Sequence, residues 1–258
     1  MSRPPVIAFG QQPCGFFPRR FLVAKVFTAR RLQRELGGEI VFFYHDADHD
    51  PRETQTFIRF PGEDEARTLN FTFLNKIQRK YSPLAGKQIN PDWQENMVRQ
   101  LGAALDQPTL DLFRSIRAET VADFCLAVYQ RMGMLEGIRV VRSSDPQLRA
   151  QACAIDDYFV DVAWAGETVR ARKTAAGLQL HCGGDAFLTL PPCAYDASQI
   201  SPARDSRLRW MQSVLHCTHY IAGAGEQAYL NAAEAPDITY VPRDKINRSH
   251  EAYLDFPI

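Results

Sequence analysis

Several patterns that would assign a chemistry directly are missing from this sequence. Its six cysteines are scattered singly and form no C-x-x-C pair, which argues against a zinc site or a thioredoxin-type site. It contains neither G-x-G-x-x-G nor G-x-x-x-x-G-K-[ST], so the dinucleotide fingerprint and the P-loop are excluded. No apolar run approaches the roughly 18 residues of a membrane span, and residues 1–5 lack the apolar stretch of a signal peptide. We therefore expect a cytoplasmic protein in which most cysteines are buried, reduced thiols.

The chain also lacks a net charge, since 30 basic residues balance 30 acidic ones. We therefore expect small-molecule substrates, with neither nucleic acid nor a membrane as a partner. Locally the charge is uneven: residues 1–44 hold seven basic residues and two acids, whereas residues 45–65 hold seven acids and two arginines. This reversal fits either a site between the two segments or solvated faces of opposite sign. With 258 residues, 45% of them hydrophobic, the chain can fill a core without disulfides or a structural metal.

The first 45 residues have the pattern of a strand, a helix and a strand. A short apolar run ends at Gly10, and a continuous apolar run covers residues 40–44, as in strands buried on both faces. Between them, apolar residues recur every three or four positions from Leu22 to Leu36, which predicts a helix over residues 18–36 that stops at Gly37. The two strands should therefore be parallel.

The rest of the chain extends this pattern into one predicted domain. We expect residues 5–10, 39–45, 138–142 and 219–223 to be parallel neighbours in one sheet. Helical patterns over 92–105 and 109–134 predict a helical insertion at about residues 90–135, and another helix is predicted over 206–215. Short alternating segments predict a small β insertion at about residues 156–192. The predicted fold over residues 1–258 is α/β: a Rossmann-like parallel sheet with helices on both faces and a small antiparallel insertion.

Polar or glycine-containing turns follow three of the predicted strands, at residues 10–12, 46–50 and 223–226. In an open parallel sheet, ligands bind at the carboxyl ends of the strands near the switch in strand order. We therefore expect these turns to form one cleft, with Cys14 at its edge. The glycines there would let a ligand approach the backbone. The residues predicted for this cleft are Gly10, Gln11, Gln12, Lys25, Asp48, His49, Asp50, Gly223, Gly225 and Glu226.

The densest titratable cluster is residues 45–50, which contain two histidines and three aspartates. Such residues can bind a metal, move protons or hydrogen-bond a substrate's hydroxyl or amino group. Strand alternation puts His45 and His49 on one side without both Asp46 and Asp48 beside them, which disfavours a metal. We predict no metal ligands here. The predicted acid/base residues are Asp48, His49 and Asp50.

The candidate residues also have a family resemblance. The motif residues near the N-terminus are Gly10, Gln11, Gln12, Lys25, Asp48, His49, Asp50 and Glu53. They resemble the N-terminal region of the bacillithiol biosynthesis cysteine-adding enzyme family, which has T-G-Q-Q, a helix lysine, and E-D-H-D followed by an acid. The family's threonine is Phe9 in this sequence, and the first residue of E-D-H-D is Ala47.

Two later parts of the chain extend the resemblance. Residues 145–148 are similar to the family's D-P-x-L. The segments matching S-P-N-V, R-P-x-x-Q and Y-x-G-G-P-G-E-x-A-Y are residues 200–202, Arg207 with Gln212, and residues 220–229. The resemblance covers the Rossmann-like core only, without the family's C-terminal coiled coil. It implies a core related to class I aminoacyl-tRNA synthetases and nucleotidyltransferases.

The resemblance implies a ligase-like enzyme that joins an amino acid, cysteine in that family, to a small amine or amino sugar. Activation of a free carboxylate most simply uses a nucleotide, so ATP or another nucleotide is the expected co-substrate. Lys25 and the turn at Gly10 suit phosphates, because free N–H groups at a helix N-terminus favour anions. Glu226 would hold an amino or hydroxyl group of substrate. Two alternatives stay open: a non-catalytic nucleotide- or metabolite-binding module, and a metal-dependent hydrolase built on His45, Asp46, Asp48 and His49.

Overall fold

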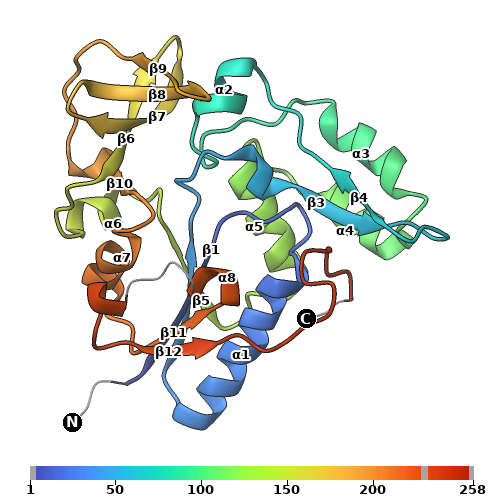
Figure 1. The fold of residues 1–258 in the computed structure, drawn as a ribbon. Helices are drawn as coiled ribbons and strands as arrows, with labels where there is room; N and C mark the ends of the chain where they lie inside the picture. Colours follow the sequence, from blue (N-terminus) through green and yellow to red (C-terminus); the bar gives the residue numbers. More distant parts are fainter. Residues whose placement is uncertain (1–3, 228–231, 256–258) are drawn as a thin grey trace.

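A five-stranded parallel sheet forms the centre of the computed structural model, which describes residues 4–227 and 232–255 (Figure 1). Its strand order is β12-β11-β1-β2-β5, and each neighbouring pair is parallel. The strands are β1 (Val6–Gln11), β2 (Glu39–Tyr44), β5 (Ile138–Arg142), β11 (His219–Ala222) and β12 (Thr239–Pro242). The predicted four-strand sheet is thus confirmed, and β12 adds an edge strand that the sequence did not predict.

Helices cover both faces of this sheet, as predicted. Ile7 and Phe9 of β1 pack into the core formed with α1, α3, α4 and α5, whereas Val6 and Ala8 pack against α6 and α7. Side chains of a strand alternate between its two faces, so a strand covered on both must be apolar throughout. The helices are α1 (Arg20–Leu36), α3 (Trp93–Leu101), α4 (Gln107–Ser115), α5 (Val121–Arg131), α6 (Pro146–Gln151) and α7 (Arg207–Leu215).

Helix α1 follows its predicted stripe except at the C-terminal end. Leu22, Val26 and Leu32 are buried, but Leu36 is 43% exposed in the last turn. The helix stops at Gly37, which has φ of 75° and donates its N–H to a carbonyl of the last turn. Glycine adopts this left-handed conformation without the steric cost of a side chain.

The predicted helix over residues 109–134 is wrong, because the chain forms two helices there. Residue Ile116 is extended at the end of α4, and Thr120 begins α5 by accepting the N–H of Asp123 at 3.2 Å. The gap predicted between residues 105 and 109 also differs from the structure, because α4 already begins at Gln107. Asp106 caps α4, and Pro108 lies in the first turn, where its missing N–H costs nothing.

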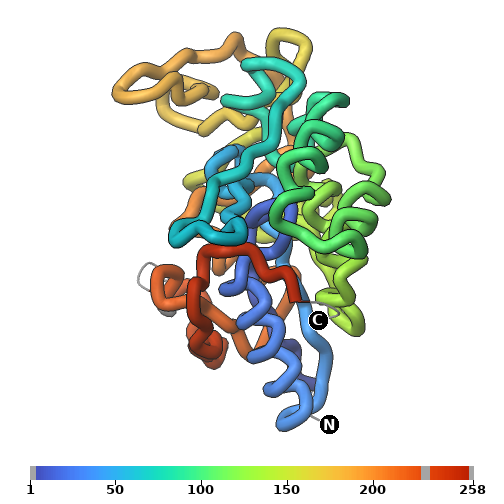
Figure 2. Tube along the Cα trace, turned by 90° about the vertical axis from the view of Figure 1, so that its right-hand side faces the viewer, coloured from blue at the N-terminus to red at the C-terminus, as the bar shows by residue number. Residues whose placement is uncertain are grey.

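The small antiparallel insertion lies near the carboxyl ends of the central strands, above them in Figure 1. Figure 2 shows the same arrangement from the side, with residues 156–192 at the end of the molecule far from the N-terminus. Its strand order is β10-β6-β7-β8-β9, so β10 extends the sheet beyond the predicted segment. The strands are β6 (Tyr158–Trp164), β7 (Glu167–Thr174), β8 (Gly177–Gly183), β9 (Ala186–Thr189) and β10 (Ile200–Pro202).

Short elements complete the described chain. A hairpin and a helix between β2 and α3 were not predicted, and the helix, α2, lines a cavity described below. These and the remaining short helices are η1 (Pro51–Thr54), β3 (Thr56–Arg59), β4 (Ala66–Leu69), α2 (Lys76–Tyr81), η2 (Ala197–Gln199), α8 (Ala224–Gln227) and η3 (Ala232–Glu234).

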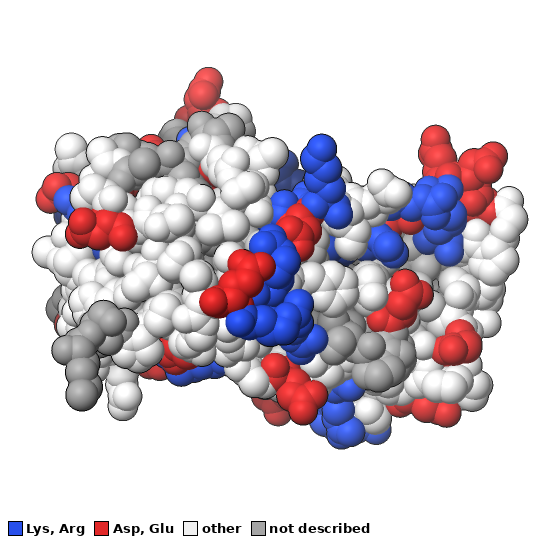
Figure 3. All heavy atoms as spheres, turned by 90° about the horizontal axis from the view of Figure 1, so that it is seen from below, with Lys and Arg blue, Asp and Glu red and all other residues white. Residues whose placement is uncertain are grey.

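The surface agrees with the balanced composition. The face in Figure 3 carries basic and acidic side chains beside one another, and Arg31 of α1 pairs with both Glu35 and Asp244. Across residues 4–227 and 232–255, no helix combines the length and apolar character that crossing a bilayer requires. All six cysteines are free, but only Cys14, Cys125 and Cys217 are buried, so the prediction that most are buried holds for half of them.

Candidate functional site

The order of strands in the central sheet reverses between β1 and β11. The chain runs from β1 through β2 to β5 on one side, and β11 and β12 then lie on the other side of β1. Lys25 and Glu226 meet at this point, with Nζ and Oε2 2.7 Å apart. Lys25 Nζ also donates to the carbonyl of Gly10 at 2.7 Å, and Tyr220 OH donates to Glu226 Oε1 at 2.7 Å. A closed hydrogen-bond network thus occupies the switch point.

This network changes the roles predicted for Lys25 and the glycines. Lys25 is 2% exposed and its charge is balanced by Glu226, so it is not a free cation for phosphate. A Cβ on Gly10 would lie 2.6 Å from both His45 Nε2 and Tyr220 OH, so the glycine makes room for these two side chains rather than for a ligand. The N–H of Gly223 donates to Glu226, and open space lies beside Gly225.

A cleft opens next to this network, between the ends of β1 and β2 and the small sheet. Gln12, Asp48 and His49 line a cavity of about 510 Å³ there. Gln12 Nε2 donates to Asp48 Oδ2 at 3.1 Å, and Gln11 Nε2 donates to Gln12 Oε1 at 3.2 Å. The candidate residues are therefore connected, but they divide into two groups. One group lines the cavity, and the other, with Gln11, Lys25 and Glu226, forms the switch-point network.

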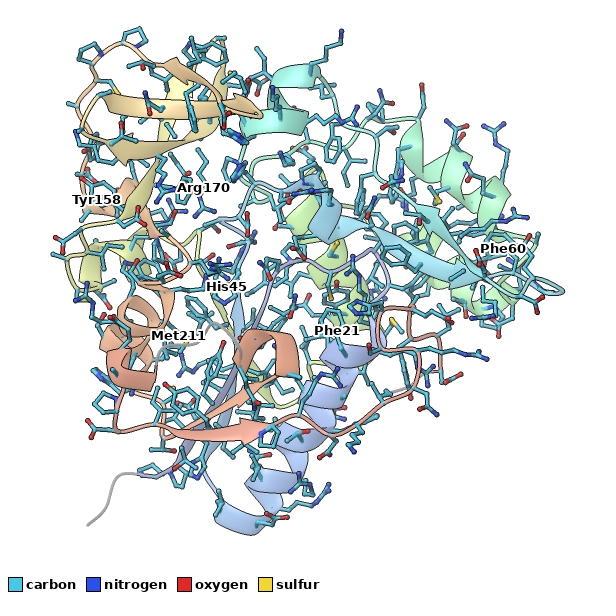
Figure 4. All side chains as sticks on the ribbon, viewed as in Figure 1. Phe21, His45, Phe60, Tyr158, Arg170 and Met211 are labelled. Carbon is cyan, nitrogen blue, oxygen red and sulfur yellow. The ribbon has the colours of Figure 1, made fainter. Side chains whose placement is uncertain are left out.

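Two arginines reach the cleft from the opposite wall. Arg170 of β7 lies 3.9 Å from Asp48 Oδ1, and Arg207 of α7 lies 4.0 Å from Asp48 Oδ2. Arg170 also donates to the carbonyls of Ala47 and Pro202, which fixes the guanidinium. Figure 4 shows Arg170 between the small sheet and the central sheet, on the same side of the molecule as His45. Asp48 is therefore set between an amide and two guanidinium groups.

These neighbours keep Asp48 ionised. Burial alone would raise the pKa of Asp48, but the charges of Arg170 and Arg207 outweigh burial and hold that pKa well below its usual range. Asp48 also accepts the backbone N–H of His49 at 2.6 Å, which shapes the loop. Asp48 is consequently a fixed negative charge rather than a proton acceptor at neutral pH.

His49 is neutral at physiological pH and has an unused ring nitrogen. Burial, reinforced by the charge of Arg170, lowers the pKa of His49 to about 4. Its Nδ1 is buried without a hydrogen-bond partner and lies 3.7 Å from Asp48 Oδ1. Buried polar atoms of folded proteins are normally hydrogen-bonded, so this unpaired nitrogen, on a residue that lines the cleft, is unusual.

Asp50 has a local structural role. It accepts the N–H of Arg52 at the start of η1 and pairs with the Arg52 side chain at 2.6 Å. Burial would raise its pKa, but the hydrogen bonds from Arg52 lower it overall. Together with Asp48 and His49, Asp50 lines a second cavity of about 870 Å³ whose far wall includes α2 and His181.

The donor set proposed for a metal does not converge. Both oxygens of Asp46 are taken by Arg142, Ser143 and Ser144, and His45 packs edge-on against Phe43 at 4.7 Å between ring centroids. Within the described ranges, no group of three or more His, Cys, Asp and Glu residues is arranged to hold a metal ion. The residues present thus do not fit the hydrolase alternative.

Cys14 does not lie at the edge of the cleft. It is fully buried, its N–H donates to Tyr129 OH at 3.1 Å, and burial raises the pKa of its thiol. The prediction that it borders the cleft is wrong, because the chain turns inward after Gln12 and places Cys14 in the aromatic core.

Sequence reasoning missed most of the opposite wall. Arg207 entered only through the resemblance, and Arg170 was not singled out. The available signal was alternation, because Val169 and Ala171 lie in the core of the small sheet and the residue between them must face the other way. Ala228 and Tyr229 of the family motif lie outside the described residues. Pro202, like Arg207, was indicated only by the resemblance, and the cleft residues that were not predicted at all are Asp157, Phe159, Arg170, Arg172, Ala203, Arg204 and Asp205.

No protein-family model matches the chain, and no curated protein sequence matches it either.

Proposed function

We propose that the protein is a carbon–nitrogen ligase that joins an amino acid to a small amine or amino-sugar acceptor in the cleft at Asp48. One observation carries this proposal. An ionised carboxylate and two guanidinium groups about 4 Å from it line the same cavity of about 510 Å³. Cavities of roughly 300–1,000 Å³ are typical of small-molecule sites.

An amino acid has the complementary pair of charges. Its ammonium group matches Asp48, whose side chain is 19% exposed, and its carboxylate matches Arg207, whose side chain is 22% exposed. Arg170 is only 5% exposed and already donates to two carbonyls, so it holds Asp48 in place rather than binding substrate directly. Arginine suits a carboxylate because its planar fork can donate two parallel hydrogen bonds.

His49 supplies the proton acceptor that amide formation needs. The attacking amine must lose a proton as the new C–N bond forms and the bond from the acyl carbon to its activating phosphate breaks. His49 is neutral and lines the cavity, and a neutral imidazole has one ring nitrogen with a lone pair that can accept a proton. A substrate anion near Arg170 would offset the charge that lowers the pKa of His49, so substrate binding would make this imidazole a stronger base.

The nucleotide and the identity of the amino acid rest on the family resemblance. That resemblance supports cysteine as the amino acid, an amino sugar as the acceptor, and ATP or another nucleotide as the co-substrate that activates the carboxylate. Activation by a nucleotide is consistent with a Rossmann-like sheet, because such sheets bind ligands at the carboxyl ends of their strands.

The test is a turnover screen with mass-spectrometric detection of the amide. Purified protein is incubated with ATP, each amino acid in turn and glucosamine, and nucleotide consumption is followed in parallel. We expect amide formation that requires all three, and we expect Arg207→Gln to raise the KM for the amino acid. The matched control is Arg99→Gln on α3, where the side chain is exposed and, among the described residues, hydrogen-bonds only to Asn96. The screen is repeated with other small amines and amino sugars as acceptors, and absence of an amide with every amino acid and acceptor would contradict the ligase.

The binding-module alternative is favoured by one feature, the pairing of Lys25 with Glu226. Because this pair neutralises the cation at the switch point, Lys25 is not available for the phosphates that carboxylate activation needs, which favours binding without turnover. Saturable binding of nucleotide or amino acid without any turnover would support this second function.

A further inference from the structure

Residues at the start of η1 and on α2 form a wall shared by two cavities. Pro51, Arg52, Lys76 and Arg79 line the cavity of about 870 Å³ that contains His49, and they also line a groove of about 620 Å³ on their other side. We call Arg52, Lys76 and Arg79 the basic ridge. One side of the basic ridge therefore lines the cavity that contains His49, and the other side lines the 620 Å³ groove.

The charges of the basic ridge are largely unmatched. The lining of the 620 Å³ groove includes these three cations and no acid. Arg52 pairs with Asp50, but Lys76 and Arg79 are exposed and form no ion pair within residues 4–227 and 232–255. The acids that line the 870 Å³ cavity are Asp48, Asp50 and Glu53, and the first two already face arginines. An anion at the ridge would thus meet two cations that no protein group neutralises.

The segment that carries these cations is held in place from beneath. Lys87 is fully buried, and its Nζ donates to the carbonyls of Gln78 and Arg79 at 2.6 and 2.9 Å. At the other end of α2, Asn75 accepts the N–H of Gln78 at 2.9 Å. The backbone of α2 is therefore fixed at both ends, so little ordering of the backbone is needed when a ligand binds. Burial also lowers the pKa of Lys87 to about 7, and an anion nearby would favour its charged form.

We propose that the basic ridge binds the phosphate chain of a small molecule. Phosphate oxygens are strong acceptors for lysine and arginine, and a chain of two or three phosphates carries enough charge to engage both Lys76 and Arg79. This inference rests on the proposed ligase only in identifying the phosphate source as the nucleotide. Lys25 at the switch point is not available for phosphate because it pairs with Glu226, whereas the unmatched cations lie on α2.

The experiment measures binding without requiring turnover. Inorganic tripolyphosphate is titrated into the full chain by calorimetry at constant ionic strength, for the wild type and for Lys76→Ala/Arg79→Ala. We expect the double variant to bind at least about tenfold more weakly, because it loses two charge-assisted contacts. The matched control is Lys173→Ala/Arg99→Ala, which removes the same two residue types from exposed positions outside both cavities. Its affinity should equal that of the wild type.

Two further ligands identify the source of the phosphates. ATP binding that weakens in the Lys76→Ala/Arg79→Ala variant supports a nucleotide, whereas binding of glucosamine 6-phosphate but not ATP would overturn the phosphate chain and indicate a site for the single phosphate of an acceptor. No binding of tripolyphosphate to the wild type, or equal binding by both double variants, would overturn the proposal that the basic ridge binds phosphate. Phosphate binding without amide formation would refute the ligase alone, and amide formation with an unchanged KM for ATP in the Lys76→Ala/Arg79→Ala variant would refute the ridge alone.

Discussion

Lys25 and Glu226, 201 positions apart in sequence, form a largely buried ion pair that joins α1 to α8. The pair lies where the strand order reverses, the place at which Rossmann-like sheets usually bind a ligand. Here the protein fills that place with its own charges, and the open cleft is displaced toward Asp48 and the small sheet.

We predict that Glu226→Ala is strongly destabilising. It leaves Lys25 buried without its counter-charge, and breaking a buried pair from one side typically costs about 3–5 kcal/mol. Urea unfolding monitored by circular dichroism measures the loss. The control is Glu35→Ala, which breaks an exposed pair with Arg31 and should change the free energy of unfolding by about 0.5 kcal/mol at most. A loss below about 1 kcal/mol for Glu226→Ala would contradict the importance of this pair.

Gly10 is predicted to be required for packing. Gly10→Ala would place a Cβ 2.6 Å from His45 Nε2 and from Tyr220 OH, so both buried side chains would have to move. Overpacking of this kind typically costs about 1–3 kcal/mol. Gly225→Ala is the matched control, because its Cβ would meet nothing within 4 Å. Thermal unfolding of the two variants side by side would refute the prediction if their midpoints were equal.

The stability of the protein should fall as the pH is lowered from about 6.5 to about 4. The pKa of His49 is about 4 in the folded chain and near 6.5 when unfolded, so the unfolded chain binds more protons in this window. The free energy of unfolding therefore decreases by up to about 1.4 kcal/mol per pH unit from this group. Burial also lowers the pKa of His45 well below its usual value, which adds in the same direction.

His49→Gln tests this assignment, because glutamine keeps a polar side chain but does not titrate. Urea unfolding at several pH values from 7 to 4 should give a shallower dependence for His49→Gln than for the wild type. Equal slopes would mean that His49 is protonated to the same extent in the folded and unfolded chains.

Much of the central sheet could be predicted because β1, β2 and β11 contain continuous apolar runs, as expected of strands covered on both faces. The edge strand β12 was missed because its four residues include a proline and none of them is fully buried. The helix predicted over 109–134 is too long because the helical spacing of apolar residues continues across Thr120, although this residue caps the start of a new helix.

The candidate site was predictable only in part, for a different reason. Polar turns after strands indicate where a cleft lies, but not which way each side chain points. Asp46 and Asp48 are two residues apart, and yet Asp46 turns inward to Ser143 and Ser144 while Asp48 faces the cleft. The oppositely charged partners of Lys25 and Asp48, which are Glu226, Arg170 and Arg207, lie more than 100 residues away, and no local sequence pattern indicates such pairings.

The most direct test of the central claim compares amide formation by His49→Ala with that of the wild type, using the amino acid, amine and nucleotide found in the turnover screen. We predict that the rate falls about 10²–10⁴-fold, the usual contribution of a positioned acid or base. The melting temperature should stay within a few degrees of the parent, because the ring lies at the cleft with its Nδ1 unpartnered. Full activity in a folded His49→Ala variant would contradict the account.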